Sequence, residues 1–272
     1  MAPKWQPRAA RRAAVDGVYS PAMNPQPPPE RLMGRNSDFA WDSFDSCSYL
    51  THNYGTLRDD DRQIVEGVRD FFAPLDPAMV RQGLDVGSGT NLYPALTMLP
   101  LCDKITLWEY ASSNVRWLRR EVRRYSQSWD GFWDLLSQDP LYKSVEDPRA
   151  ALVRKALVRK GSIFDLPVSR WDVGTMFFVA ESISADVREF QAATQRFVRS
   201  LKPGAPFAAA FMKNSTGYDV GDRRFPAVAV DVDDVHDCLA GSAEDVKIER
   251  ISAANPLRTG YDGMILALGK AT

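Results

Sequence analysis

An apolar run that breaks into a glycine turn is the feature that most constrains how this chain can fold. Residues 84–86 lead into Gly87 and Gly89, and a second apolar run, residues 105–108, ends at Glu109. Glycines in such a turn let the backbone approach a ligand closely, and an acid at the end of the next strand can bind both hydroxyls of a ribose. The pattern therefore predicts an α/β fold with a site for a nucleoside cofactor.

The cofactor predicted from this turn is S-adenosylmethionine (SAM) rather than a dinucleotide. The third glycine of the usual dinucleotide turn is replaced by Leu92, and residues 87–94 contain no basic side chain to pair with a pyrophosphate. SAM carries a ribose and an adenine but no phosphate, so the glycines and the acid suffice for it. A purely structural turn and an NAD-dependent reductase are the alternatives.

The composition predicts a single globular domain with neither a metal site nor a disulfide framework. A chain of 272 residues with 44% hydrophobic content can bury one sizeable core, and a net charge of -1 argues against general nucleic-acid binding. The three cysteines, Cys47, Cys102 and Cys238, are far apart. His52 and His236 are the only histidines, and both are expected to be structural or exposed.

The N-terminal residues 1–38 are rich in proline and arginine, and we expect them to form a flexible tail. A targeting helix is the alternative, which the prolines and Asp16 disfavour. Neither a run of eighteen or more apolar residues nor the apolar core of a secretory signal occurs, so a cytoplasmic protein without membrane association is expected. Residues 39–272 are predicted to form one domain, with an N-terminal helical lid at 39–78 and a helical insertion at 126–156.

Strands and helices are predicted to alternate along this domain. Helical spacing covers 59–72 and 112–125, and apolar runs predict strands at 171–179, 207–212, 246–248 and 264–268. This alternation implies a doubly wound, Rossmann-like sheet with helices on both faces. Ligands bind at the carboxyl ends of the strands in such sheets, which is where Asp85, Glu109 and Glu181 fall.

Four segments of the chain resemble one enzyme family. They are Tyr49 to Tyr54, Asp85 to Tyr93, Glu109 and Tyr110 with Asn114, and Phe178 to Ser184. The family is that of the small-molecule N-methyltransferases acting on nicotinamide, phenylethanolamine and indolethylamine or thioether substrates. The resemblance runs from about Phe44 to the C-terminus, with weaker similarity at 201–204, 218–225 and 258–262. It implies a class I methyltransferase fold with SAM as cofactor and S-adenosylhomocysteine (SAH) as product.

The resemblance also implies roles for individual residues. Tyr49 and Tyr54 would close over the cofactor. Glu109 would bind its ribose, and Tyr110 would pack on its adenine. The other residues implied at the cofactor are Asp85, Gly87, Ser88, Gly89, Thr90, Tyr93, Asn114, Ser162, Ile163 and Phe178. The residues implied at the methyl acceptor are Glu181, Tyr218 and Asp262.

Two positions depart from the family pattern. Ser162 stands where the family usually has an aspartate that reads the adenine amino group, with Asp165 as a nearby substitute. Ala210 stands where several members place a second acid beneath the substrate amine. The second departure argues against a pocket for a doubly charged amine.

The reaction implied is methyl transfer to a nitrogen of a small amine or N-heterocycle, of the kind found in specialised metabolism. Such an in-line displacement requires alignment of the reacting atoms and exclusion of water, but neither a metal nor a covalent nucleophile. Glu181 is the candidate for holding or deprotonating the acceptor, and a helix-capping role is its alternative. Transfer to oxygen or carbon, another SAM-dependent reaction and a non-catalytic binding module also remain open.

Overall fold

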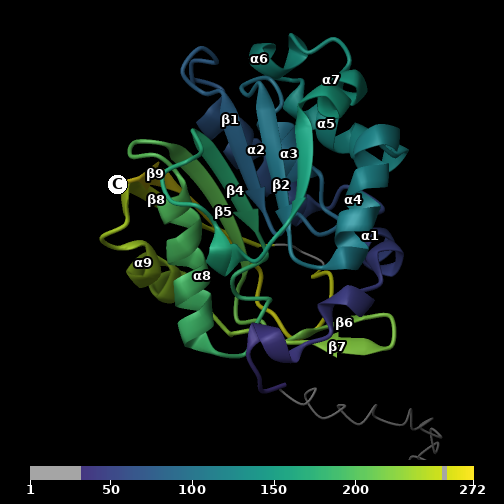
Figure 1. The fold of residues 1–272 in the computed structure, drawn as a ribbon, viewed down its shortest axis with the longest axis vertical. Helices are drawn as coiled ribbons and strands as arrows, with labels where there is room; N and C mark the ends of the chain where they lie inside the picture. Colours follow the sequence, from purple (N-terminus) through teal and green to yellow (C-terminus); the bar gives the residue numbers. More distant parts are fainter. Residues whose placement is uncertain (1–31, 253–255) are drawn as a thin grey trace, which may run out of the picture.

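The computed structural model describes residues 32–252 and 256–272, which build a seven-stranded sheet between layers of helices (Figure 1). Its strand order is β3-β2-β1-β4-β5-β9-β8. The first five strands of this order are parallel to one another, and β9 is antiparallel to both of its neighbours, β5 and β8. The strands are β1 Gln82–Val86, β2 Lys104–Glu109, β3 Ala156–Lys160, β4 Val173–Phe177, β5 Pro206–Met212, β8 Ala243–Ile251 and β9 Met264–Ala271, and a separate hairpin consists of β6 Tyr218–Val220 and β7 Arg223–Phe225.

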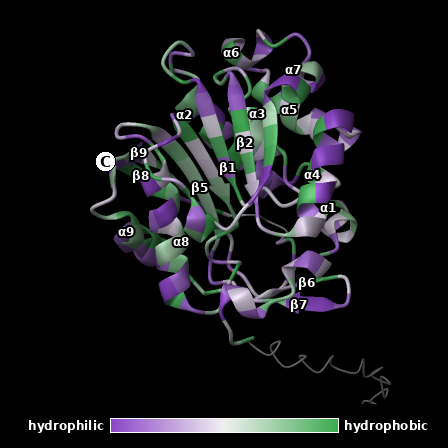
Figure 2. Ribbon diagram, viewed as in Figure 1, coloured by the Kyte–Doolittle hydropathy of each residue, from purple (hydrophilic) through white to green (hydrophobic). Residues whose placement is uncertain are grey.

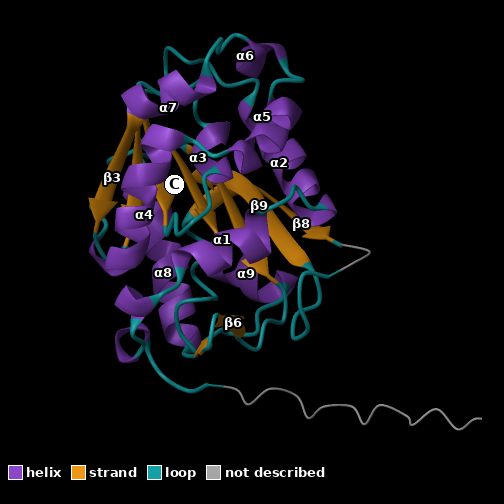
Figure 3. Cartoon of the chain, turned by 90° about the vertical axis from the view of Figure 1, so that its right-hand side faces the viewer, coloured by secondary structure: helices purple, strands orange, loops and turns teal. Residues whose placement is uncertain are grey.

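Helices cover both faces of the sheet (Figure 3). The helices are α1 Ser46–Tyr54, α2 Asp59–Phe72, α3 Tyr93–Thr97, α4 Ser112–Arg124, α5 Asp130–Leu136, α6 Pro140–Lys143, α7 Pro148–Lys155, α8 Val187–Ser200 and α9 Val232–Leu239, with 3-10 turns η1 Asn36–Asp38, η2 Trp41–Ser43, η3 Gln127–Trp129 and η4 Ile163–Asp165. One hydrophobic cluster joins the sheet to α2 through α7, and a second joins it to α8 and α9. The predicted doubly wound fold is confirmed.

The central strands are apolar because both of their faces are covered. Every residue of β4 and β5 is buried, and hydrophobic residues gather in the sheet in Figure 2. Helix α2 buries only one side, at Ile64, Val65, Val68 and Phe72. Three aspartates in its first turn suit the positive end of the helix dipole. Sequence periodicity therefore predicted these elements correctly.

The N-terminal segment packs on the β6–β7 hairpin beyond one end of the sheet (Figure 1). The rings of Trp41 and Phe44 each lie 5.1 Å from the ring of Phe225. Ser46 on α1 donates a hydrogen bond from Oγ to Oδ1 of Asn114 on α4 at 2.8 Å. These contacts connect residues 41–46 to the β6–β7 hairpin and to α4.

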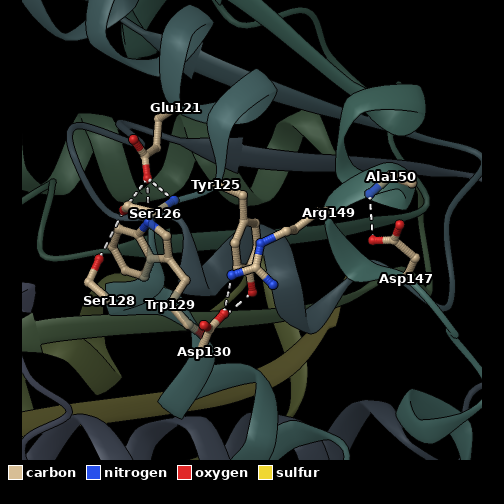
Figure 4. A network of polar contacts seen from close by, with 9 residues as sticks. All are labelled: Glu121, Tyr125, Ser126, Ser128, Trp129, Asp130, Asp147, Arg149 and Ala150. Carbon is tan, nitrogen blue, oxygen red and sulfur yellow. Dashed lines mark hydrogen bonds and ion pairs between the residues drawn. The ribbon is translucent and has the colours of Figure 1, made fainter.

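A polar network holds the helical segment that follows α4 (Figure 4). Glu121 on α4 accepts a hydrogen bond from the indole Nε1 of Trp129 at 2.8 Å. Arg149 on α7 pairs with Asp130 at the start of α5, and its guanidinium lies 4.6 Å from the ring centre of Tyr125. The helices α5 and α7 are thus tied to each other and to the end of α4.

One strand of the sheet was missed by the sequence analysis. The edge strand β3 pairs in parallel with β2, with Ile105 opposite Ala156 and Glu109 opposite Lys160. At this edge of the sheet only alternate side chains of the strand contact the core. Arg159 and Lys160 also interrupt the apolar pattern. The segment therefore has no long apolar run. The helical insertion was predicted to extend to residue 156, whereas α7 ends at Lys155.

Most of the predicted tail, residues 1–31, lies outside the described residues. The described chain begins at Leu32, and the backbone N–H of Asn36 donates to the Glu189 carboxylate on α8 at 2.7 Å. Packing on the domain thus starts before the predicted boundary at residue 38. The division into tail, lid, core and insertion stays a prediction.

Candidate functional site

The glycine turn after β1 requires its glycines for two different reasons. Gly87 has φ +63° and Gly89 has φ +54°, both in the left-handed region that side chains disfavour. A Cβ on Gly87 would also lie 2.6 Å from the methyl carbons of Val179. At Gly89 the nearest atom to such a Cβ is a backbone oxygen 3.6 Å away, so space remains beside the turn.

Glu109 lies at the end of β2 with its carboxylate against this turn. One carboxylate oxygen accepts the backbone N–H of Gly89 at 2.8 Å, and the other accepts that of Ala111 at 2.7 Å. Burial raises the pKa of Glu109, and these two amides oppose the rise. The parallel pairing of β1 with β2 therefore brings the predicted acid to the predicted turn.

A cavity opens at the carboxyl ends of β1, β2 and β4, and most predicted site residues line it. Those that line it are Tyr49, Tyr54, Gly87, Ser88, Gly89, Thr90, Glu109, Tyr110, Asn114, Ser162, Ile163, Phe178 and Tyr218. The tyrosines Tyr49 and Tyr54 come from α1, and their ring centres are 6.1 Å apart. Phe178 follows β4 with φ +59°, a rare conformation for a side-chain-bearing residue.

Four predicted site residues, Asp85, Tyr93, Glu181 and Asp262, do not line the cavity. Asp85 is buried within the sheet, where it accepts the hydroxyl of Thr175 at 2.8 Å. Tyr93 is buried in α3 and donates its hydroxyl to Asp61 at 3.1 Å. Asp262 is exposed and accepts a hydrogen bond from the side chain of Asn214. Their sequence neighbours carry the motif, but the side chains themselves point into the core or to the surface.

Glu181 lies in the turn between β4 and α8 and is fully buried. Its Oε1 accepts the backbone N–H of Met212 at 2.9 Å and the hydroxyl of Ser182 at 3.1 Å. Its Oε2 is buried without a hydrogen-bond partner among the described residues. Burial raises the pKa of Glu181 to about 7. Helix α8 is capped by Asp186, so the helix-capping alternative for Glu181 is wrong.

Several residues of this first cavity were missed by the sequence analysis. They are Asn36, Trp41, Phe44, Val86, Asn91, Trp108, Ala111, Gly161, Phe177, Val179, Ser182 and Ile183. The aromatic cluster around Trp41 signals ordered structure in the sequence, but nothing there assigns it to the site. The indole of Trp108 packs so closely on Gly161 that an added Cβ would lie 2.3 Å away, a contact that only the β2–β3 pairing creates.

A second, smaller cavity adjoins the first. The two share Tyr49, Tyr54, Phe178, Ser182 and Tyr218. The second cavity is also lined by Asp61 of α2 and by Arg258, neither of which was predicted as a site residue. Burial, with Asp60 beside it, raises the pKa of Asp61 to about 7. In the sequence Asp61 is one of three acids at a helix start, which hides its place in a cavity.

The first cavity fits a nucleoside cofactor that lacks phosphate. No lysine or arginine is among the described residues that line it, whereas a pyrophosphate would require a basic partner. The Oγ1 of Thr90, directly after the glycine turn, is buried with no hydrogen-bond partner in the described chain. A buried hydroxyl without a partner is costly, so a ligand atom is expected to bind it.

Comparison with known proteins shows which family the chain belongs to. The NNMT/PNMT/TEMT family profile matches residues 35–270. The chain belongs to this family. Phenylethanolamine N-methyltransferase of Macaca mulatta is 25% identical over 247 residues, covering 82% of this chain and 86% of that protein. The human enzyme is 25% identical over 251 residues with the same coverage.

Solved structures show the same fold at low sequence identity. The N-methyltransferase NodS from Bradyrhizobium japonicum WM9, in complex with SAH, is 13% identical with a TM-score of 0.51, covering 79% of this chain and 88% of that one. A SAM-dependent methyltransferase from Clostridium acetobutylicum ATCC 824 is 13% identical with a TM-score of 0.52, covering 82% and 95%.

Membership in the family makes the protein a SAM-dependent methyltransferase, as the resemblance implied. SAM is its cofactor, and SAH is the product formed from it. Among the described residues, none of the helices has the length and apolar character needed to cross a membrane.

Proposed function

We propose that the protein transfers the methyl group of SAM to a nitrogen of a small amine or N-heterocycle. The observation that carries the proposal is the carboxylate of Glu109, held by the backbone amides of Gly89 and Ala111 at the edge of the first cavity. The curated relatives, which are phenylethanolamine N-methyltransferases, support nitrogen as the methylated atom.

The residues of the first cavity have distinct roles in this proposal. Glu109 accepts the ribose hydroxyls, and the glycines Gly87 and Gly89 let the methionine part of SAM lie against the turn. Tyr110 packs on the adenine. Asn114 would contact the ribose, Ser162 and Ile163 would lie near the adenine, and Ser88 and Thr90 offer hydroxyls beside the turn. When bound, SAM would supply the methyl group of its sulfonium: the acceptor nitrogen would bond to the methyl carbon in line with the carbon–sulfur bond, which would break to release SAH. An amine nitrogen would also lose one proton to a base.

The acceptor lies between the two cavities, where Tyr49, Tyr54 and Tyr218 exclude water from the reacting atoms. Glu181 lines neither cavity, but its Oε1 is hydrogen-bonded to Ser182 and to the backbone of Met212, two residues that line the second cavity. In this proposal its unpaired Oε2 holds or deprotonates an acceptor nitrogen that enters beside them. Alignment of the two reactants is the main source of rate, since orientation of this kind contributes roughly 7–11 kcal/mol.

Calorimetric titration with SAM and SAH tests the cofactor site first. Saturable binding with a stoichiometry near one supports the proposal, and its absence refutes it. Turnover is then measured as SAH formation with a panel of amines and N-heterocycles. Product NMR identifies the methylated atom. Methylation on oxygen or carbon would support the second class of reaction, and SAH binding without turnover on any acceptor would favour a binding module.

A further inference from the structure

Arg258 is a half-buried cation in the wall of the second cavity. Its guanidinium lies 5.7 Å from the ring centre of Tyr218 and 5.2 Å from that of Tyr261. It donates to the backbone oxygen of Gly217 at 2.7 Å and to the hydroxyl of Ser215 at 3.0 Å. All of these partners are neutral, and they hold the guanidinium plane in one orientation.

The charge of Arg258 has no counter-ion within 4.0 Å in the described part of the chain. The other acids near this cavity have neighbours of their own: Asp219 pairs with Arg224 at 3.2 Å, and Asp61 accepts the Tyr93 hydroxyl. Glu181 is close enough to attract the guanidinium, but the two make no ion pair. Even partial burial of an arginine without an anion is unfavourable, so an anion from outside the chain would stabilise this arrangement.

Arg258 lies where a bound methyl acceptor can reach it. The second cavity shares its tyrosines and Phe178 with the first, so a molecule that extends from the methyl-transfer position can reach Arg258. Guanidinium groups bind carboxylates with two parallel hydrogen bonds. Asn53 and His52 line the same cavity and offer further polar contacts to an acidic group.

We propose that Arg258 binds a carboxylate of the methyl acceptor, so that the acceptor is an amino acid or a heterocyclic carboxylate rather than a simple amine. The proposal rests on the function proposed above and narrows its substrate class. The acceptor nitrogen faces Glu181 and the first cavity, and the carboxylate faces Arg258.

The test compares matched ligand pairs that differ in the carboxylate. The pairs are pyridine-3-carboxylate with pyridine-3-carboxamide, and tryptophan with tryptamine. Each ligand is titrated calorimetrically into the SAH complex of the wild-type protein and of the R258Q and R258K variants. R170Q serves as the control, because Arg170 also stacks on an aromatic ring, at 5.2 Å from Trp171, but lies outside both cavities.

We expect the acid of at least one pair to bind about tenfold more tightly than its neutral partner in the wild type and in R170Q, as a charge-assisted hydrogen bond provides. R258Q should lose this preference, and R258K should keep part of it. SAH affinity should be unchanged in all variants, and loss of SAH binding by the wild type would instead refute the proposed function.

Three results would overturn the proposal while leaving the methyltransferase function intact. The first is tighter binding of the neutral member in both pairs. The second is a preference for the acid that survives in R258Q. The third is that the SAH complex binds no acid of the panel at millimolar concentration. Equal weakening of both members of a pair in R258Q, with a lower melting temperature, would assign Arg258 a structural role.

Discussion

The backbone N–H of Gly89 donates to the carboxylate of Glu109 at 2.8 Å, although 20 residues separate the two along the chain. The same carboxylate accepts the N–H of Ala111, two residues beyond it. Glu109 therefore links the turn after β1 to the entry of α4, and it does so at the edge of the first cavity. A residue that holds both segments is expected to govern cofactor affinity and local order together.

Replacement of Glu109 by glutamine should weaken SAM and SAH binding by about 10- to 100-fold, since hydrogen bonds to a charged group contribute roughly 1.5–3 kcal/mol. The NH2 group of the glutamine would also lie against one of the two backbone N–H groups, so that two hydrogen-bond donors would face each other. Calorimetric titration measures the change. The control is E244Q, which removes an exposed acid on β8. Unchanged affinity in E109Q would contradict the role of Glu109 at the ribose.

Replacement of Gly87 by alanine should destabilise the protein by about 2–4 kcal/mol, combining left-handed backbone strain with overpacking against Val179. Gly204 provides the matched control, because it has φ +77° but no atom within 4 Å of an added Cβ. G204A should therefore show only the backbone strain of about 1–2 kcal/mol. Urea unfolding measures both. If the two variants were equally destabilised, the contact with Val179 would have no energetic importance.

Replacement of Ser46 by alanine removes the hydrogen bond from α1 to Asn114 on α4. We expect α1 to move away from the first cavity more often, which should raise the KM for SAM several-fold. The melting temperature should change little, since a neutral hydrogen bond contributes about 1 kcal/mol. Limited proteolysis of α1 should become faster, and bound SAH should slow it. S48A is the control, because Ser48 is half-buried on the same helix and its side chain makes no hydrogen bond within the described chain. Equal behaviour of the two variants would argue against a role for this contact in closure.

Burial raises the pKa of Glu181 to about 7 in the folded protein, against an ordinary value of 4.5. The folded state therefore binds a proton that the unfolded state has lost between these two pH values. The contribution of Glu181 to stability is fully present below pH 4.5 and is lost as the pH rises through about 7. E181Q should remove this loss, up to about 3 kcal/mol. Urea unfolding of both proteins from pH 5 to 8 measures it, and parallel pH profiles would contradict the shift.

Methyl transfer should follow the same titration if Glu181 acts on the acceptor. The value of kcat/KM should rise with an apparent pKa near 7 as Glu181 ionises, and E181Q should flatten this profile. SAH affinity should stay constant between the two proteins, because Glu181 does not line the first cavity. A wild-type profile that persists unchanged in E181Q would assign the titration to another group.

Local sequence patterns were sufficient to predict the glycine turn, Glu109 and the main helices. A turn between two parallel strands brings the end of the second strand beside it, so residues 87–89 and Glu109 had to meet once the strands paired. Tyr93 and Asp262 do not line the first cavity, because a motif marks a segment and does not state which way each side chain points.

The amino-acid sequence by itself determined the fold class, the cofactor turn and its partner acid, because these depend on short-range periodicity and on the fixed geometry of parallel strands. Tertiary structure alone decided the second cavity. Asp61 comes from an N-terminal helix, and Arg258 comes from the loop before the last strand. Their proximity to Tyr218 depends on how α1, α2 and the β6–β7 hairpin pack over the sheet. Such long-range packing of side chains leaves no periodic signal in the chain.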